Sequence, residues 1–276
     1  MFQLDYNRAI REGSVGAVGA IPGTVASFPL DFIKVHQQSH PTPLSLRKAV
    51  DFLSLKSIIR GCGPAVSQKI ATRAPMFLCS SLAVQASESI GFDPLPAAFI
   101  GSALSGYVTG SFAAVFEWRK VVTATSPASA TTKFGSTYAF VKSAPSAMSV
   151  MRRMHFAGTR NAIFDSCFFF SRKLLIEKTD LRGATTYGIA AATAVVLDYA
   201  VDVAVKRCMR EKPWEIDPRV KAKIGGVARA TIGICLNEGL GVFRGLGAKV
   251  AEFSVSYVVT GLCAFQVMAA VDTILK

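Results

Sequence analysis

Charged residues are scarce in this chain, and acidic residues are the scarcest. Asp, Glu, Lys and Arg make up 18% of the 276 residues, whereas a soluble domain carries about 25%. Hydrophobic residues make up 51%, which excludes a disordered or collagen-like chain. The 31 basic residues outnumber the 18 acidic ones, and the net charge of +13 favours an acidic partner such as nucleic acid, anionic lipid or an anionic solute.

The sequence also offers little for a metal site or a catalytic centre. Its six cysteines contain no CxxC pair, and its three histidines show no metal-ligand spacing. The glycine-rich stretches match neither of the common phosphate-binding loops. No basic run is interleaved with aromatic residues in the manner of a nucleic-acid-binding module. We therefore predict a protein that is not an enzyme, holds no metal or organic cofactor and binds no nucleic acid.

Long charge-free runs recur along the chain. Three of them approach the length of about 20 residues that a membrane-spanning helix needs, and these are Gly13–Leu30, Pro94–Phe116 and Phe253–Val271. Two shorter runs, Ala74–Ser87 and Gly183–Leu197, indicate helices that turn one face towards a polar interior. The pattern predicts a multi-pass membrane protein with a water-filled centre. A soluble protein with buried helices is the alternative.

Similar stretches end three of the apolar segments at an even spacing. They begin at Pro29, Val115 and Ala200, which lie 86 and 85 residues apart. Each carries an acidic residue two positions further on, and these residues are Asp31, Glu117 and Asp202. Each unit consists of a helix, a polar segment and a second helix. We therefore expect three repeats in one membrane domain, over residues 1–92, 93–180 and 181–276.

The repeated stretches resemble the motif P-x-[DE]-x-x-[KR] of the mitochondrial carrier family. Pro29, Asp31 and Lys34 match it in full, and Gln38 falls where that family often has a glutamine. The second and third repeats keep the motif in part, through Glu117, Lys120 and Asp202. The resemblance covers nearly the whole chain. It implies an all-α membrane protein of the mitochondrial inner membrane, with six transmembrane helices in three pseudo-threefold helix–loop–helix repeats around a central cavity.

The resemblance implies a gate at the matrix end of the helix bundle. Its residues are Pro29, Asp31, Lys34, Gln38, Glu117, Lys120 and Asp202. In the family's pattern the acid of one helix pairs with the base of another. Asp31 would then pair with Lys120, and Asp202 would pair with Lys34.

Two features depart from the family's pattern. Glu117 meets no base at the family's position in the third repeat, so it depends on Lys206 or Arg207 for a partner. The family's second gate, at the other end of the even-numbered helices, has no acid–base pair here; its positions hold Ser80, Ser81, Val84, Arg172, Lys173, Ile176, Ala264, Phe265 and Met268. We therefore expect the state with the matrix end closed to be favoured.

The family's substrate contact points lie near the middle of the even-numbered helices. Counting along the repeats places Gln68, Arg160, Asn161 and Glu252 there. An arginine followed by an asparagine resembles the pair used by carboxylate and keto-acid carriers, because a guanidinium binds a carboxylate through two parallel hydrogen bonds. Glu252 would repel an anion or pair with Arg160, so a ligand site and a structural ion pair both remain open.

The resemblance also implies a lipid partner. Arg60-Gly61 and Arg244-Gly245 stand where the family has a basic residue and a glycine before an even-numbered helix. Basic pockets and helix N-termini bind the phosphates of cardiolipin and other anionic phospholipids. Bound cardiolipin is therefore the one bound group that we expect.

Two functions are compatible with these motifs. The first is a transport-impaired accessory subunit of a larger inner-membrane complex of the respiratory-chain type. Three features favour it: the missing second gate, the missing prolines of the second and third motifs, and Glu252. The second is an active carrier that exchanges small anionic metabolites; the complete first motif and the Arg160–Asn161 pair favour it. The motifs favour the accessory subunit by a small margin.

Overall fold

A computed structural model describes residues 4–39, 55–125, 141–142, 146–181, 183–210 and 226–274, and these ranges are helical with no β-strand. Six α-helices of 27 to 35 residues dominate. They are α1 (Tyr6–Ser39), α3 (Leu55–Ser89), α4 (Pro94–Thr125), α7 (Ala147–Lys178), α8 (Ala184–Arg210) and α10 (Leu246–Ile274). A short helix, α9 (Gly226–Glu238), and a 3₁₀ turn, η2 (Gly239–Phe243), precede α10. The predicted all-α class is confirmed.

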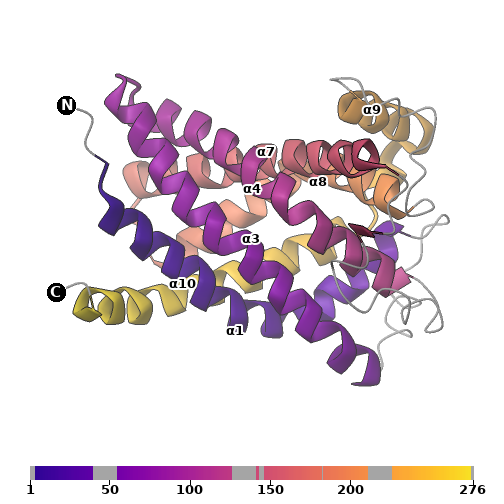
Figure 1. The fold of residues 1–276 in the computed structure, drawn as a ribbon, viewed down its shortest axis with the longest axis horizontal. Helices are drawn as coiled ribbons and strands as arrows, with labels where there is room; N and C mark the ends of the chain where they lie inside the picture. Colours follow the sequence, from indigo (N-terminus) through magenta and orange to yellow (C-terminus); the bar gives the residue numbers. More distant parts are fainter. Residues whose placement is uncertain are drawn as a thin grey trace.

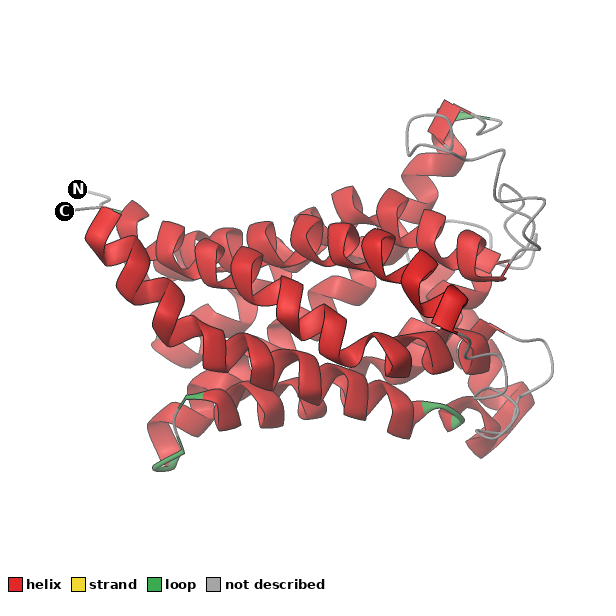
Figure 2. Cartoon of the chain, turned by 90° about the horizontal axis from the view of Figure 1, so that it is seen from below, coloured by secondary structure: helices red, strands yellow, loops and turns green. Residues whose placement is uncertain are grey.

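The six long helices form a closed ring in chain order. Each helix packs against the next one, and α10 returns to pack against α1 (Figure 1). Further contacts join α1, α4 and α8 to one another across the ring. The start of α1 and the end of α10 lie at the same end of the bundle, and the long helices run through the length of the molecule (Figures 1 and 2).

Among the described residues, three helices are long and apolar enough to cross a membrane. Their spans are Tyr6–Lys34, Pro94–Arg119 and Ala184–Lys206. The first two contain the predicted runs in α1 and α4. The third contains Gly183–Leu197 from Ala184 onward, a run that is shorter because Asp198 interrupts it, although that side chain is buried inside the ring. The run Phe253–Val271 lies in α10, and the side chains of several of its residues are outside the described part of the chain.

The outer surface of these three helices is apolar. Large hydrophobic side chains are exposed along α1, α4 and α8, namely Val18, Ile21, Val25, Leu104, Val108, Phe112, Val196 and Leu197. Charged side chains of the same helices are buried instead, and these include Asp31, Lys34, Glu117, Asp198 and Asp202. An apolar exterior around a charged interior suits a ring surrounded by lipid.

The helix ends follow local sequence. Ser146 caps α7, because its side chain accepts a hydrogen bond from the Ser149 amide at 3.3 Å. The same helix ends where the Thr179 amide donates to the Leu175 carbonyl. Gly91 has a φ of 98°, a left-handed conformation that glycine adopts at no steric cost, and it lies in the turn between α3 and α4.

Replacing Gly101 with alanine is expected to destabilise the bundle by about 1–3 kcal/mol. A Cβ at Gly101 would lie 2.7 Å from backbone atoms of Ala83 and Val84 in α3, and backbone atoms cannot rotate away. Gly233→Ala is the matched control, because a Cβ at that helical position in α9 meets nothing within 4 Å. It should stabilise α9 by about 0.5–1 kcal/mol. Thermal unfolding in detergent measures both changes, and shifts of the same sign would contradict the close α3–α4 contact.

Candidate functional site

A cavity of about 80 Å³ lies inside the ring, with walls contributed by all six long helices. Because one water molecule needs about 10–15 Å³, the cavity has room for several waters or one small solute. Its walls are crowded with charge. The charged residues lining it are Asp31, Lys34, Lys69, Arg73, Glu117, Arg160, Asp165, Asp198, Asp202, Lys206 and Lys249.

Helical spacing explains why these side chains face inward together. In α8, Asp198, Asp202 and Lys206 recur every fourth residue and therefore share one face of the helix. In α10, Lys249, Glu252, Ser256 and Thr260 follow the same spacing of three or four residues. The family motifs do not include Asp198 and Lys249. A search for polar residues at helical spacing inside apolar segments finds them.

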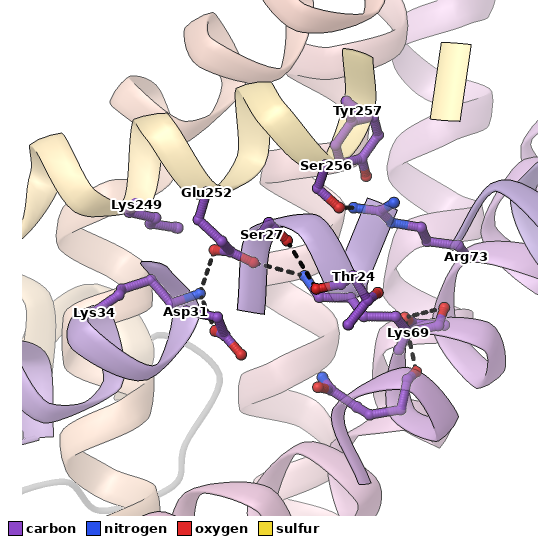
Figure 3. A network of polar contacts seen from close by, with 12 residues as sticks. Thr24, Ser27, Asp31, Lys34, Lys69, Arg73, Lys249, Glu252, Ser256 and Tyr257 are labelled. Atoms are coloured by element: carbon purple, nitrogen blue, oxygen red, sulfur yellow. Dashed lines mark hydrogen bonds and ion pairs between the residues drawn. The ribbon is translucent and has the colours of Figure 1, made fainter. Parts of the chain in front are cut away.

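The first charge network joins α1, α3 and α10 around Glu252 (Figure 3). The Lys34 ammonium lies 2.6 Å from Glu252 Oε2 and 2.7 Å from Asp31 Oδ1. The Lys69 ammonium lies 3.2 Å from Glu252 Oε1. Glu252 is fully buried, and its two ion pairs link α1 and α3 to α10.

The second charge network joins α4, α7, α8 and α10 around Asp202. Arg160 Nη1 bridges Glu117 Oε1 at 2.5 Å and Asp202 Oδ1 at 3.1 Å. Lys206 and Lys249 hold Asp202 Oδ2 at 2.8 Å and 3.1 Å. Asp198, one turn earlier in α8, accepts a hydrogen bond from Lys249 at 2.7 Å. Every carboxylate in this network therefore has a cationic partner.

These networks differ from three ion pairs that the sequence led us to expect. Lys34 pairs with Asp31 and Glu252 rather than with Asp202, because Asp202 is held by residues of α7, α8 and α10. Arg160 pairs with Glu117 and Asp202 rather than with Glu252. Glu117 takes Arg160 as its partner instead of Lys206, and the Arg207 side chain lies outside the described part of the chain. Helical register placed these residues near the cavity, but the reach of each side chain decides its partner.

The remaining candidates fall into two groups. Gln68, Arg160 and Asn161 line the cavity, and the Asn161 side-chain oxygen accepts hydrogen bonds from the Arg160 guanidinium. Pro29 is half-buried in α1 and is not among the residues that line the cavity. The other group lies outside the residues whose side chains the structure describes, and its members are Gln38, Arg60, Gly61 and Lys120. Because Lys120 belongs to this group, the expected Asp31–Lys120 pair stays a prediction.

Arg73 and Asp165 line the cavity and form no ion pair with another described residue. The Arg73 guanidinium donates to the hydroxyls of Ser256 at 2.7 Å and Thr260 at 2.9 Å, and it lies 4.2 Å from the centre of the Tyr257 ring. Figure 3 shows it reaching from α3 to α10. Asp165 Oδ2 is buried and meets no hydrogen-bond donor among the described residues.

An aromatic layer bounds the cavity on the side towards the start of α1. Phe77 of α3 lies 6.2 Å from Phe168 of α7 and 6.3 Å from Tyr187 of α8, measured between ring centres. Phe168 lies 4.7 Å from Tyr257 of α10 in the same way. A Cβ at Gly16 of α1 would lie 3.0 Å from the Phe77 ring, so the layer spans the bundle. The family motifs do not include these aromatic residues.

A second cavity, of about 200 Å³, lies on the far side of Phe77. Six of the expected second-gate positions line it, namely Ser80, Ser81, Val84, Arg172, Lys173 and Ile176. They contain no acid, but α1 supplies one: Glu12 Oε2 lies 4.0 Å from Arg172 Nη1. Lys173 instead pairs with Glu177 one turn along its own helix.

The candidate lipid site at Arg244-Gly245 lies between η2 and α10. Gly245 has a φ of 90°, and the Arg244 carbonyl accepts a hydrogen bond from the Tyr199 hydroxyl at 2.6 Å. The Arg244 side chain is exposed. Beside it, α9 and η2 expose a row of large apolar side chains, Ile232, Leu236, Leu240 and Phe243.

No model of a known protein family matches this sequence, and no curated protein matches it either.

Proposed function

We propose that the chain is a mitochondrial-carrier-type protein of the inner membrane, with six transmembrane helices in three repeats, and that it transports a small charged solute. One observation carries the proposal: a ring with an apolar exterior encloses a cavity walled by charged side chains from every long helix. Charge inside a membrane is costly, and it commonly marks the path of a solute or ion. The closed order of helices and the contacts among α1, α4 and α8 are compatible with three helix pairs around a common axis.

The two boundaries of the cavity suggest how such a carrier would work. Ion pairs tie the helices together around Lys34, Glu252, Arg160 and Glu117, and the aromatic layer closes the opposite side. Transport requires each boundary to open in turn. A solute shifts that equilibrium only if it binds one state better than the other. A solute that carries its own charges can shift the equilibrium by competing for the charged groups of these ion pairs.

An accessory subunit of a larger inner-membrane complex is the second candidate function. One observation favours it: Arg160, the expected contact for a substrate carboxylate, is already bound by Glu117, Asp202 and Asn161. In that case the charge networks hold the ring in one shape, and the apolar outer faces pack against other subunits.

Anionic phospholipid is the proposed lipid partner in either case. The exposed Arg244 side chain lies next to the apolar row of α9 and η2. A basic residue beside exposed apolar side chains suits a membrane surface, where phosphate groups lie above acyl chains.

Access to the cavity from the two membrane sides tests transport against a structural role. We expect Thr72→Cys, placed on the cavity wall of α3 in a chain with the native cysteines replaced by serine, to react with a membrane-impermeant thiol reagent from either side of oriented proteoliposomes. Ser89→Cys, exposed at the end of the same helix, is the matched control and should react from one side only. Labelling of Thr72→Cys from a single side would favour the accessory subunit.

A further inference from the structure

The charges on the cavity wall are matched with two exceptions. Each of the other charged residues that line the cavity has an oppositely charged partner within 4.0 Å, as the two networks show. Arg73 is the exception among the described cations of the wall, and Asp165 is the exception among its described carboxylates. One positive and one negative group therefore face the same small space with no ion-pair partner.

Arg73 is built to receive a carboxylate. The residue is only 2% exposed, and a buried cation without a counter-charge is costly. Two of its five N–H donors go to the Ser256 and Thr260 hydroxyls. Hydroxyls are neutral, so they satisfy hydrogen bonds without balancing the charge. A carboxylate in the cavity would supply that balance.

Asp165 is built to receive a cation. It is 2% exposed, and its Oδ2 atom lacks a donor in the described part of the chain. The nearest arginine along α7, Arg160, is committed to the second charge network. Gln68 on α3 adds a second acceptor, because its Oε1 atom is also buried without a donor among the described residues. An ammonium group has three donors, which suits a carboxylate and an amide side chain on the same cavity wall.

We propose that the cavity binds a small zwitterion of the α-amino-acid type, with its carboxylate on Arg73 and its ammonium group on Asp165 and Gln68. An anion alone would leave Asp165 unmatched and lie near its charge, and a cation alone would leave Arg73 unmatched. The volume of about 80 Å³ suits a small ligand. This inference names the solute of the proposed carrier, and its consequence for transport rests on that function.

Three probes of similar size test the proposal on the full-length protein in detergent. L-alanine carries both groups, propionate keeps only the carboxylate, and ethylamine keeps only the ammonium group. We expect alanine to raise the unfolding temperature with an apparent affinity at least about tenfold tighter than either single-charge probe, because each charged contact is worth a factor of that order.

Variants assign the two contacts. Asp165→Asn should weaken alanine binding about tenfold or more while strengthening propionate binding, because it removes a negative charge near the anion; Arg73→Gln should weaken the binding of both probes. Arg172→Gln is the matched control, since Arg172 lines the second cavity, on the far side of the aromatic layer. This substitution should leave alanine binding unchanged. If a variant fails to fold, the comparison of the three probes on the unmodified protein still decides.

Two results would overturn the zwitterion site: propionate binding as tightly as alanine, or no stabilisation by alanine at millimolar concentration. These results are separate from the transport test. Alanine binding together with one-sided labelling of Thr72→Cys would keep the site and remove the carrier function. Two-sided labelling of Thr72→Cys without alanine binding would keep the carrier function and remove the zwitterion site.

Discussion

Replacing Glu252 with glutamine is expected to cost about 3–5 kcal/mol of stability, because it removes one partner of a buried ion pair. The carboxylate is fully buried and binds two ammonium groups, those of Lys34 at 2.6 Å and Lys69 at 3.2 Å. Glutamine keeps the size of the side chain and loses its charge. Both lysines are themselves buried, so neither is solvated by bulk water when the charge is gone.

Thermal unfolding of the detergent-solubilised protein measures this effect. Glu177→Gln is the matched control, because it removes the same group from an exposed pair on α7, where Lys173 lies 3.6 Å away. Exposed pairs contribute about 0.2–1 kcal/mol, so the control should barely shift the midpoint. Similar shifts for the two variants would mean that the Glu252 network does not hold α1, α3 and α10 together.

Replacing Arg160 with methionine is expected to be comparably destabilising, at about 3–5 kcal/mol. Arg160 Nη1 bridges Glu117 on α4 and Asp202 on α8. Asp202 keeps Lys206 and Lys249 after the change. Glu117 loses the cation that the structure gives it and is left as a buried, uncompensated carboxylate.

A second substitution should recover most of that loss. In the double variant Arg160→Met with Glu117→Leu, apolar groups replace both charges, and such replacements of buried pairs are often neutral. The double-mutant cycle should therefore give an interaction energy at the upper end of about 0.5–3 kcal/mol. Additive losses in the two single variants would contradict a direct Arg160–Glu117 bond. Unfolding midpoints, with size-exclusion profiles as a check on folding, provide the four values.

Much of the architecture follows from residue patterns. The charge-free runs in α1 and α4 mark two of the helices that are apolar enough to cross a membrane. The charge-free run of the third, α8, is shorter, because Asp198 ends it at Leu197. A rule that counts uninterrupted apolar residues penalises any helix that carries inward-facing charge. Helical periodicity recovers such a helix, since Asp198, Asp202 and Lys206 share one face.

The candidate site is harder to predict than the helices. Counting along the repeats led to Gln68, Arg160 and Asn161, which the structure places on the cavity wall. It did not lead to Arg73 or Asp165, which belong to no motif. Nor could it assign ion-pair partners, because lysine and arginine side chains reach across several candidate acids. The choice between Glu252 and Asp202 for Lys34 depends on distances across the ring, which one-dimensional spacing does not contain.

The closure of the ring by α10 has a consequence for biosynthesis. Glu252 lies 218 residues after Lys34 and 183 residues after Lys69. At roughly 5–20 residues per second of ribosomal elongation, the two lysines wait on the order of ten to forty seconds for their shared carboxylate. During that interval the nascent bundle lacks its last wall. A chain interrupted before α10 would carry charged groups open to lipid, which is a feature that membrane quality-control proteases and chaperones could recognise.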